Sequence, residues 1–168
     1  MTWRRRLKPV FQPFFRAWWR FNRGMTLGVR GVVLNEAGQV LLVEHTYTHG
    51  WHLPGGGVER GETAEQSLAR ELIEEAGVSM GAPPVLVGIH DNFVNFRGDH
   101  VICYRVERWT QGEATSRGEI LAVRWVDPAL LPPQVSPLTR RLIAAALTPL
   151  APGARLDSTA PFGQESET

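Results

Sequence analysis

A run of three glycines, followed after one short loop by a glutamate-rich helix, constrains this chain more than any other feature. The glycines stand at positions 55–57, and Glu71, Glu74 and Glu75 follow. Residues three and four positions apart lie on one face of a helix, so these three carboxylates lie close together. Like charges at such spacings weaken a helix unless something neutralises them. A hard divalent cation with oxygen ligands fits that requirement, and a solvated acidic face is the alternative that the helix alone leaves open.

The surrounding residues predict where this helix begins and ends. Thr63 suits the N-cap, and Gln66 three positions later completes a capping box. Gly77 suits the left-handed position that ends a helix. The glutamates fall on one arc and the apolar residues on another, which comprises Leu68, Ala69, Leu72, Ile73 and Ala76. We therefore expect one side of the helix to pack on a core and the other to face a cleft.

The glycines upstream make the pattern specific, because backbone without a Cβ atom can approach a ligand closely. Together the turn and the helix resemble the Nudix box at every fixed position, here Gly56, Glu62, Arg70, Glu71, Leu72, Glu74, Glu75, Gly77 and Val78. The resemblance extends along the chain from residue 27 to residue 147. It implies an α/β fold, a Nudix-type α/β/α sandwich with a mixed β-sheet.

The resemblance also implies a reaction and a cofactor. Similar enzymes hydrolyse a diphosphate linkage in a nucleoside diphosphate derivative or a nucleoside triphosphate, by attack of water on phosphorus, and use Mg²⁺ or Mn²⁺. Such chemistry needs a cation to neutralise phosphate charge and a carboxylate to accept a proton from water. By the resemblance, the metal ligands are Glu71, Glu74, Glu75 and the backbone carbonyl of Gly55.

The catalytic residues that we expect are Glu71, Glu74, Arg70 and Glu119. Arg70 resembles the residue that pairs with a box glutamate and holds the loop against the helix, although a plain surface charge is the alternative. The general base stays open, because relatives place it either inside the box or on a later loop or strand. Glu119 is the candidate outside the box, as base or as an extra ligand, and a solvent-facing strand residue is its alternative.

The residues that we expect to bind substrate are Gly56, Gly57, Phe93 and Asn95. The glycine backbone can admit a phosphate chain, an aromatic ring can stack on a base, and an amide can bond to the edge of that base. Loop packing is the alternative for Phe93 and Asn95. The sequence does not single out one nucleotide.

The rest of the chain alternates strands with turns. We expect strands at 27–34, 40–43, 51–53, 85–93, 100–109 and 119–126, and a last helix at 138–147. The turn at 36–39 predicts a hairpin between the first two strands, and the turn at 95–99 predicts another between the strands that flank it.

Length and composition indicate one globular domain. The chain has 168 residues, of which 43% are hydrophobic and 21% charged, and its single cysteine excludes an internal disulfide and suits a cytoplasmic protein. We expect the Nudix domain at residues 25–149, a basic aromatic helical segment at residues 1–24, and a disordered tail at residues 150–168.

The first segment carries seven basic and no acidic side chains within residues 1–23, interleaved with aromatic ones. It fits neither a secretory signal nor a transmembrane span. Docking on its own domain or on a second subunit of a homodimer, and contact with an anionic membrane surface, stay open as alternatives. Contact with nucleic acid is the alternative that we favour least.

Two other functions are weighed against hydrolysis. A non-catalytic Nudix-fold module that binds a nucleotide or a partner, held at a membrane by residues 1–23, is one. Relatives of that kind usually lack a box glutamate, and this chain keeps them all. Isomerisation of an isoprenoid diphosphate would need a catalytic cysteine, and Cys103 lies in an alternating strand-like run that indicates a buried role.

Overall fold

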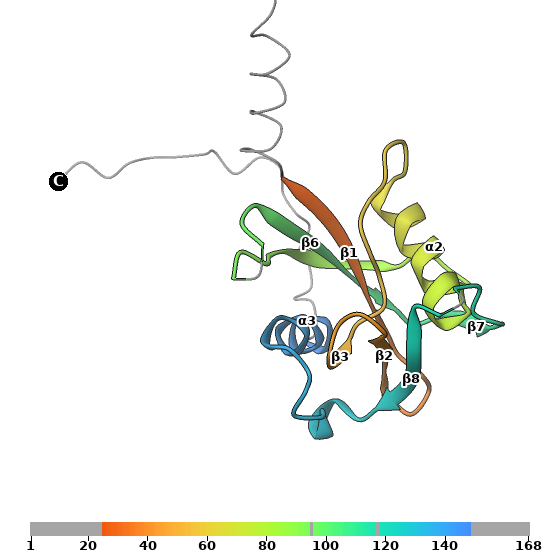
Figure 1. Ribbon diagram of the computed structural model, residues 1–168. Coiled ribbons are helices and arrows are strands. Elements are labelled where there is room, and N and C mark those ends of the chain that lie inside the picture. Colours follow the sequence, from red (N-terminus) through yellow and green to blue (C-terminus); the bar gives the residue numbers. More distant parts are fainter. Residues whose placement is uncertain (1–24, 95, 117, 149–168) are drawn as a thin grey trace, which may run out of the picture.

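The computed structural model describes residues 25–94, 96–116 and 118–148. Their strands form a layer between two helices, which lie on its opposite sides (Figure 1). The strands are β1 (Thr26–Val33), β2 (Val40–His45), β3 (Trp51–His52), β4 (Val78–Met80), β5 (Val85–Asp91), β6 (Asp99–Val106), β7 (Trp109–Gln111) and β8 (Ile120–Val126). The helices are α2 (Ala64–Ala76), the short 3₁₀ helix η2 (Pro128–Leu130) and α3 (Pro137–Leu147). None of the helices in the described part of the chain could span a lipid bilayer.

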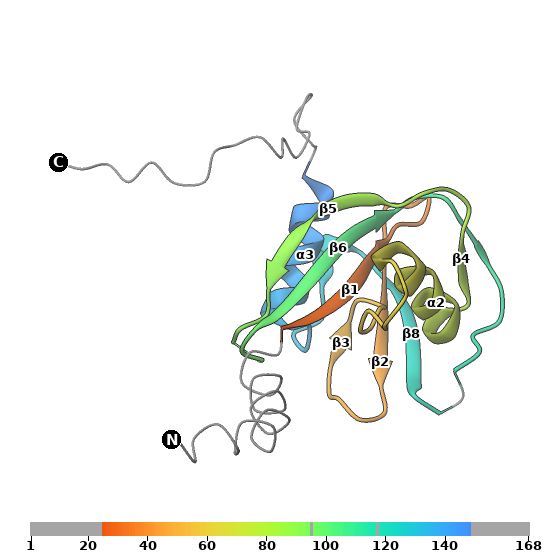
Figure 2. The same ribbon diagram turned by 90° about the horizontal axis from the view of Figure 1, so that it is seen from above.

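The strands pair in three groups. In the first, β1 lies parallel to β6, which pairs antiparallel with β5, so this sheet is mixed. In the second, β2 lies between β3 and β8 and is antiparallel to both. The short strands β4 and β7 form a third, antiparallel pair beyond the end of α2. Figure 2 shows these groups from above, with α2 and α3 on either side of β1.

The buried apolar residues form two clusters, one on each side of the strand layer. The cluster under α2 comprises Val29, Val33, Leu41, Val43, Leu68, Leu72, Ala76, Val78, Tyr104 and Val106. The cluster under α3 comprises Val32, Val40, Leu42, Leu53, Val101, Cys103, Val126, Val135, Leu142, Ile143 and Ala146. Successive residues of β1 and β2 alternate between the two clusters, as the period of a strand requires. This arrangement confirms the predicted α/β/α sandwich and the buried position of Cys103.

The predicted hairpin between the first two strands is wrong. β1 and β2 share only an isolated bridge between Leu34 and Val40 at the turn that joins them. One edge of β1 pairs with β6, and the other accepts the glycine segment, where the amide of Val29 donates to the carbonyl of Gly56 over 2.8 Å. Since both edges of β1 are occupied, β2 passes into the second sheet. The other predicted hairpin, between β5 and β6, is confirmed.

Helix α2 begins and ends at the predicted residues. The Thr63 side chain accepts from the Gln66 amide, the Gln66 side chain accepts from the Thr63 amide, and Gly77 ends the helix at φ 65°. The predicted apolar arc needs one correction, because Ile73 is exposed whereas Glu75 is buried. Leu68, Leu72 and Ala76, each four positions apart, point at the core. Glu75 precedes Ala76 on the side toward the glycine turn, and Ile73 lies on the outer side.

The expectations for residues 1–24 and 150–168 lie outside the described residues. The docked, membrane-bound and nucleic-acid alternatives for the first segment therefore stay predictions, as does the homodimer.

Candidate active site

The glycine turn pairs with the edge of β1 that lies opposite β6, as an added strand would. The Gly31 amide donates to the Pro54 carbonyl over 2.9 Å, and the Val58 amide donates to the Leu27 carbonyl over 2.9 Å. Gly55 has a φ of 137°, and a Cβ atom there would collide with the backbone carbonyl of Val29. Only glycine therefore allows the turn to lie this close to β1.

Glu75 joins this turn to helix α2. It is 6% exposed, and its Oε2 accepts a hydrogen bond of 2.8 Å from the Gly55 amide. Burial raises the pKa of Glu75 to about 7; the hydrogen bond from Gly55 and the charge of Arg30 oppose the shift, and the charges of Glu71 and Glu119 add to it. A buried carboxylate with acidic neighbours is a group that a cation would stabilise in its charged form.

Glu71 lies against the same turn one residue further along. A Cβ atom at Gly56 would collide with the Glu71 carboxylate, whose side chain is 14% exposed. The carbonyl of Gly57 faces the helix and accepts from the Ser67 hydroxyl over 3.0 Å. Gly55 and Gly56 are thus each in contact with a box glutamate, Glu75 and Glu71, which lie 20 and 15 positions further along the sequence.

Arg70 holds the loop to the helix, as the resemblance implies. Its Nε and Nη2 donate to the two carboxylate oxygens of Glu62 over 2.8 and 3.1 Å. Its Nη1 donates to Glu71 over 2.8 Å and to Glu74 over 3.2 Å, and Nη2 also reaches the Gly57 carbonyl over 3.3 Å. The bonds from Arg70 hold the pKa of Glu62 below its ordinary value. Arg70 therefore supplies positive charge to the acidic face of α2, so it is more than a surface charge.

The acidic side chains offer the ligand type that a divalent cation prefers, but their hydrogen bonds to Arg70 and Gly55 point them in different directions. Three carboxylates and the Gly55 carbonyl offer only oxygen, which is the ligand that Mg²⁺ prefers. Among the described residues, however, no three His, Cys, Asp or Glu side chains are arranged as a ready metal site. Glu71 and Glu74 turn to Arg70, and Glu75 turns to Gly55. Side-chain rotation would be needed to bring these oxygens around one ion.

We call Glu71, Glu74 and Glu75 the acidic group. Glu119 lies at its edge. The loop before β8 packs against the end of α2, where the Ser116 amide donates to the Glu74 carbonyl over 2.9 Å. The Ser116 hydroxyl donates to Glu119 over 3.2 Å, and the charge of Glu119 contributes to the pKa shift of Glu75. The structure therefore brings Glu119 near the box glutamates, although 44 positions separate it from Glu75.

A cavity of about 590 Å³ opens beside the acidic group, between β1, β2, β3 and the start of α3. Its lining includes Arg30, His45, Tyr47, His52 and Phe96. A smaller cavity of about 190 Å³, lined by both Gly56 and Gly57, adjoins it and shares Arg30 with it. A larger depression of about 720 Å³ lies at the turn between β1 and β2, and none of the acidic group lines it.

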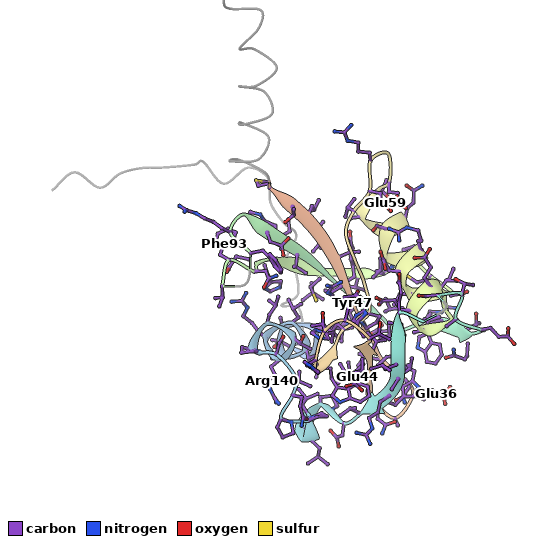
Figure 3. All side chains as sticks on the ribbon, in the orientation of Figure 1. Glu36, Glu44, Tyr47, Glu59, Phe93 and Arg140 are labelled. Atoms are coloured by element: carbon purple, nitrogen blue, oxygen red, sulfur yellow. The ribbon has the colours of Figure 1, made fainter. Side chains whose placement is uncertain are left out.

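Phe93, the residue that we expected to stack on a base, lies away from the larger cavity. Phe93 does not line the 590 Å³ cavity; its ring packs edge-on against His100 at a centroid distance of 5.2 Å. Figure 3 labels Phe93 at the turn after β5, whereas Tyr47 lies near β1 and β3. Tyr47 is 72% exposed at the cavity, and its ring lies 5.0 Å from that of His45. Asn95 lies outside the described residues.

The sequence analysis missed Arg30 and His45. Arg30 extends from β1 and donates to the carbonyl of Gly55 and, over 3.2 Å, to that of Val29. His45 is 7% exposed, and its Nε2 lies 3.6 Å from Glu75. Burial lowers the pKa of His45, so the imidazole is neutral and this contact is not an ion pair. A charged residue within an otherwise apolar strand was the one signal that could have identified Arg30.

Comparison with known proteins identifies the family. The family model described as NUDIX domain matches residues 24–146. A protein of Bacillus subtilis (strain 168), named as a candidate 8-oxo-dGTP diphosphatase, is 34% identical over 119 residues, which cover 70% of this chain and 77% of that protein. An RNA pyrophosphohydrolase of Serratia proteamaculans (strain 568) is 50% identical over 48 residues, which cover 29% of this chain but only 27% of that protein.

A solved structure shares the fold. The MutT NUDIX hydrolase from Burkholderia pseudomallei aligns with a TM-score of 0.62 at 21% identity, over 71% of this chain and 96% of that one. The family model spans more than half of this chain, and the Bacillus subtilis relative exceeds 30% identity over more than two thirds of it. This chain therefore belongs to the Nudix hydrolase family.

Proposed function

We propose that this protein hydrolyses a diphosphate linkage in a nucleoside diphosphate derivative or a nucleoside triphosphate, by attack of water on phosphorus, with Mg²⁺ or Mn²⁺ as cofactor. The observation that carries the proposal is the contact between the glycine turn and the acidic helix, in which Glu75 accepts from the Gly55 amide and Glu71 abuts Gly56. These contacts combine a backbone that can admit a phosphate chain with carboxylates that can hold its counter-ion.

The roles of the residues follow from their positions. Glu71, Glu74, Glu75 and the Gly55 carbonyl would hold the cation, which neutralises phosphate charge when it is bound. Glu71 or Glu119 would accept the proton of the attacking water, because each is an acidic side chain of this group. Arg70 would position Glu71 and Glu74 through its bonds to both carboxylates. Gly56 and Gly57 would contact the phosphates, and Tyr47 of the adjoining cavity is better placed than Phe93 to stack on a base.

The substrate class rests on the relatives as well as on the cavity. The Bacillus subtilis and Serratia proteamaculans relatives are named for different substrates, 8-oxo-dGTP and RNA. A cavity of about 590 Å³ has room for one nucleotide but not for a folded nucleic acid. We place the activity in the cytoplasm, because the one cysteine of the chain, Cys103, is a free thiol.

A substrate panel tests this proposal. Purified protein is incubated with Mg²⁺ or Mn²⁺ and with ordinary and oxidised nucleoside triphosphates, dinucleoside polyphosphates, nucleotide sugars and 5′-triphosphorylated RNA. Chromatography should detect a nucleoside monophosphate, pyrophosphate or phosphate from one class, and labelled oxygen from H₂¹⁸O should appear on phosphorus in the product. No product from any class would contradict the proposal.

A matched pair of variants ties the activity to the box. Glu74→Gln removes a carboxylate of the acidic group and should lower the rate by orders of magnitude without unfolding the protein. Glu36→Gln makes the same chemical change at the exposed turn between β1 and β2, labelled in Figure 3, and should leave the rate unchanged. Equal rates in the two variants would contradict the assignment of Glu74.

A further inference from the structure

Arg30 lies between the acidic group and the 590 Å³ cavity. It is half-buried on β1, and its guanidinium donates to the Gly55 carbonyl, the backbone oxygen to which the proposed function assigns a metal. The amide of the same Gly55 donates to Glu75, and Arg30 and His45 line the same cavity, so Arg30 stands beside both side chains. One cation of the chain itself thus stands where an external cation is expected to bind.

Among the described residues, Arg30 is also the one with a permanent charge on the cavity wall. Of the described residues that line the 590 Å³ cavity, Arg30 alone is an arginine or lysine, and no acidic residue lines it. The two other basic side chains that line it, His45 and His52, are imidazoles and not permanently charged groups. A polyphosphate that enters this cavity would therefore find one fixed positive charge on its wall.

The guanidinium has donors to spare. Both hydrogen bonds that its side chain makes within the described residues come from Nη1, to the carbonyls of Val29 and Gly55. Nε and Nη2 complete the planar fork that matches two oxygens of one phosphate. Arg30 also lines the smaller cavity with Gly56 and Gly57, where the phosphate chain is expected.

We propose that Arg30 exchanges partners during binding: it holds the Gly55 carbonyl while the cation is absent, and releases it to bind a phosphate of the substrate once a divalent cation takes that carbonyl. This inference rests on the proposed function, because it needs both the cation and the phosphate. It makes Arg30 a residue that couples the two binding events. Loading of the cation then frees the group that recognises the phosphate.

The direction in which the Mn²⁺ affinity changes distinguishes this role of Arg30 from a purely structural one. If Arg30 competes with the cation, Arg30→Met should bind Mn²⁺ about tenfold more tightly, which corresponds to the loss of one charge-assisted hydrogen bond. If Arg30 merely fastens the glycine turn to β1, its removal should loosen the turn and weaken Mn²⁺ binding. Free Mn²⁺ measured by electron paramagnetic resonance gives this affinity without any turnover.

The phosphate half of the proposal is measured on the same variants. In excess Mg²⁺, Arg30→Met should bind α,β-methylene-ADP, a diphosphate whose bridge resists hydrolysis, about tenfold more weakly by calorimetry. Arg108→Met is the matched control, since Arg108 is exposed and lines the remote 720 Å³ depression; both affinities should stay at the wild-type value. Arg30→Lys keeps the charge without the fork, so it should still lose affinity for the analogue, and it serves if the methionine variant does not fold.

The possible results are distinct. Tighter Mn²⁺ binding together with weaker analogue binding in Arg30→Met supports the exchange. Unchanged or weaker Mn²⁺ binding in that variant, or unchanged analogue binding in both Arg30 variants, overturns it while the wild type still binds Mn²⁺ and hydrolyses a nucleotide. A wild type that binds no Mn²⁺ and hydrolyses nothing overturns the proposed function and this inference together.

Discussion

The buried bond between Glu75 and the glycine turn gives the sharpest test of how this site is built. Glu75→Gln and Glu75→Met both remove the carboxylate and nearly preserve its volume, but only glutamine keeps an oxygen that can accept from the Gly55 amide. Both variants should lose hydrolysis by orders of magnitude, because both lose a proposed metal ligand. Their stabilities should differ.

The size of the difference in stability between the two variants follows from the burial of Gly55 and Glu75. Gly55 and Glu75 are both buried, so the methionine variant leaves a backbone N–H without a partner and without water. An unsatisfied buried donor costs about 2 kcal/mol, and for a domain of this size that lowers the melting temperature by about 4–8 °C. The glutamine variant should be at least as stable as the wild type, since it keeps the bond and buries no charge.

The assay is thermal unfolding of the metal-free proteins in EDTA, followed by circular dichroism. Glu65→Met, on the exposed face of the same helix, is the control and should change stability by no more than about 0.5 kcal/mol. A methionine variant that melts within about 2 °C of the glutamine variant would refute the role of the buried bond. A glutamine variant with wild-type activity would refute the role of Glu75 as a ligand.

Two further predictions concern Gly56 in the glycine turn and Cys103 in the core. Gly56→Ala places a Cβ atom against the Glu71 carboxylate and should impair hydrolysis strongly, whereas Gly112→Ala, outside the site, meets the Gly77 carbonyl at an ordinary 3.5 Å and should be nearly neutral; equal activities of the two variants would contradict the contact. Burial raises the pKa of Cys103 to about 12, so a thiolate-seeking reagent at pH 8 should leave the native protein unlabelled and label it after denaturation. Rapid labelling of the folded protein would show that the thiol is accessible.

Features that depend on near neighbours in the chain could be predicted from the sequence. The bounds of α2 follow from Thr63, Gln66 and Gly77, which lie within or beside the helix that they define. The hairpin of β5 and β6 follows from the turn between them. The box supplied the family and the acidic residues together, because so many fixed positions at set spacings rarely coincide by chance.

Features that depend on distant pairing could not be predicted. The ladder between β1 and β6 joins residues 73 positions apart, such as Thr26 and Asp99, and no local pattern reveals that it displaces β2. The burial of Glu75 depends on how the glycine turn packs over α2, which helical periodicity does not contain. His45 could not be predicted for the same reason, because only its contact with Glu75, between β2 and α2, brings it into the site.

Arg30 and Arg70 explain why the chain can fold with three glutamates so close together. Three glutamates at helical spacing should repel one another, and the sequence suggested a divalent cation as the remedy. In the structure Arg70 bonds to two of these carboxylates, and Arg30 lies close enough to the third to stabilise its charged form. The chain thus supplies its own positive charge to the site, so the fold itself does not depend on a divalent cation. Under the exchange proposed for Arg30, a cation enters by taking oxygens from arginines, and its affinity measures a competition within the site.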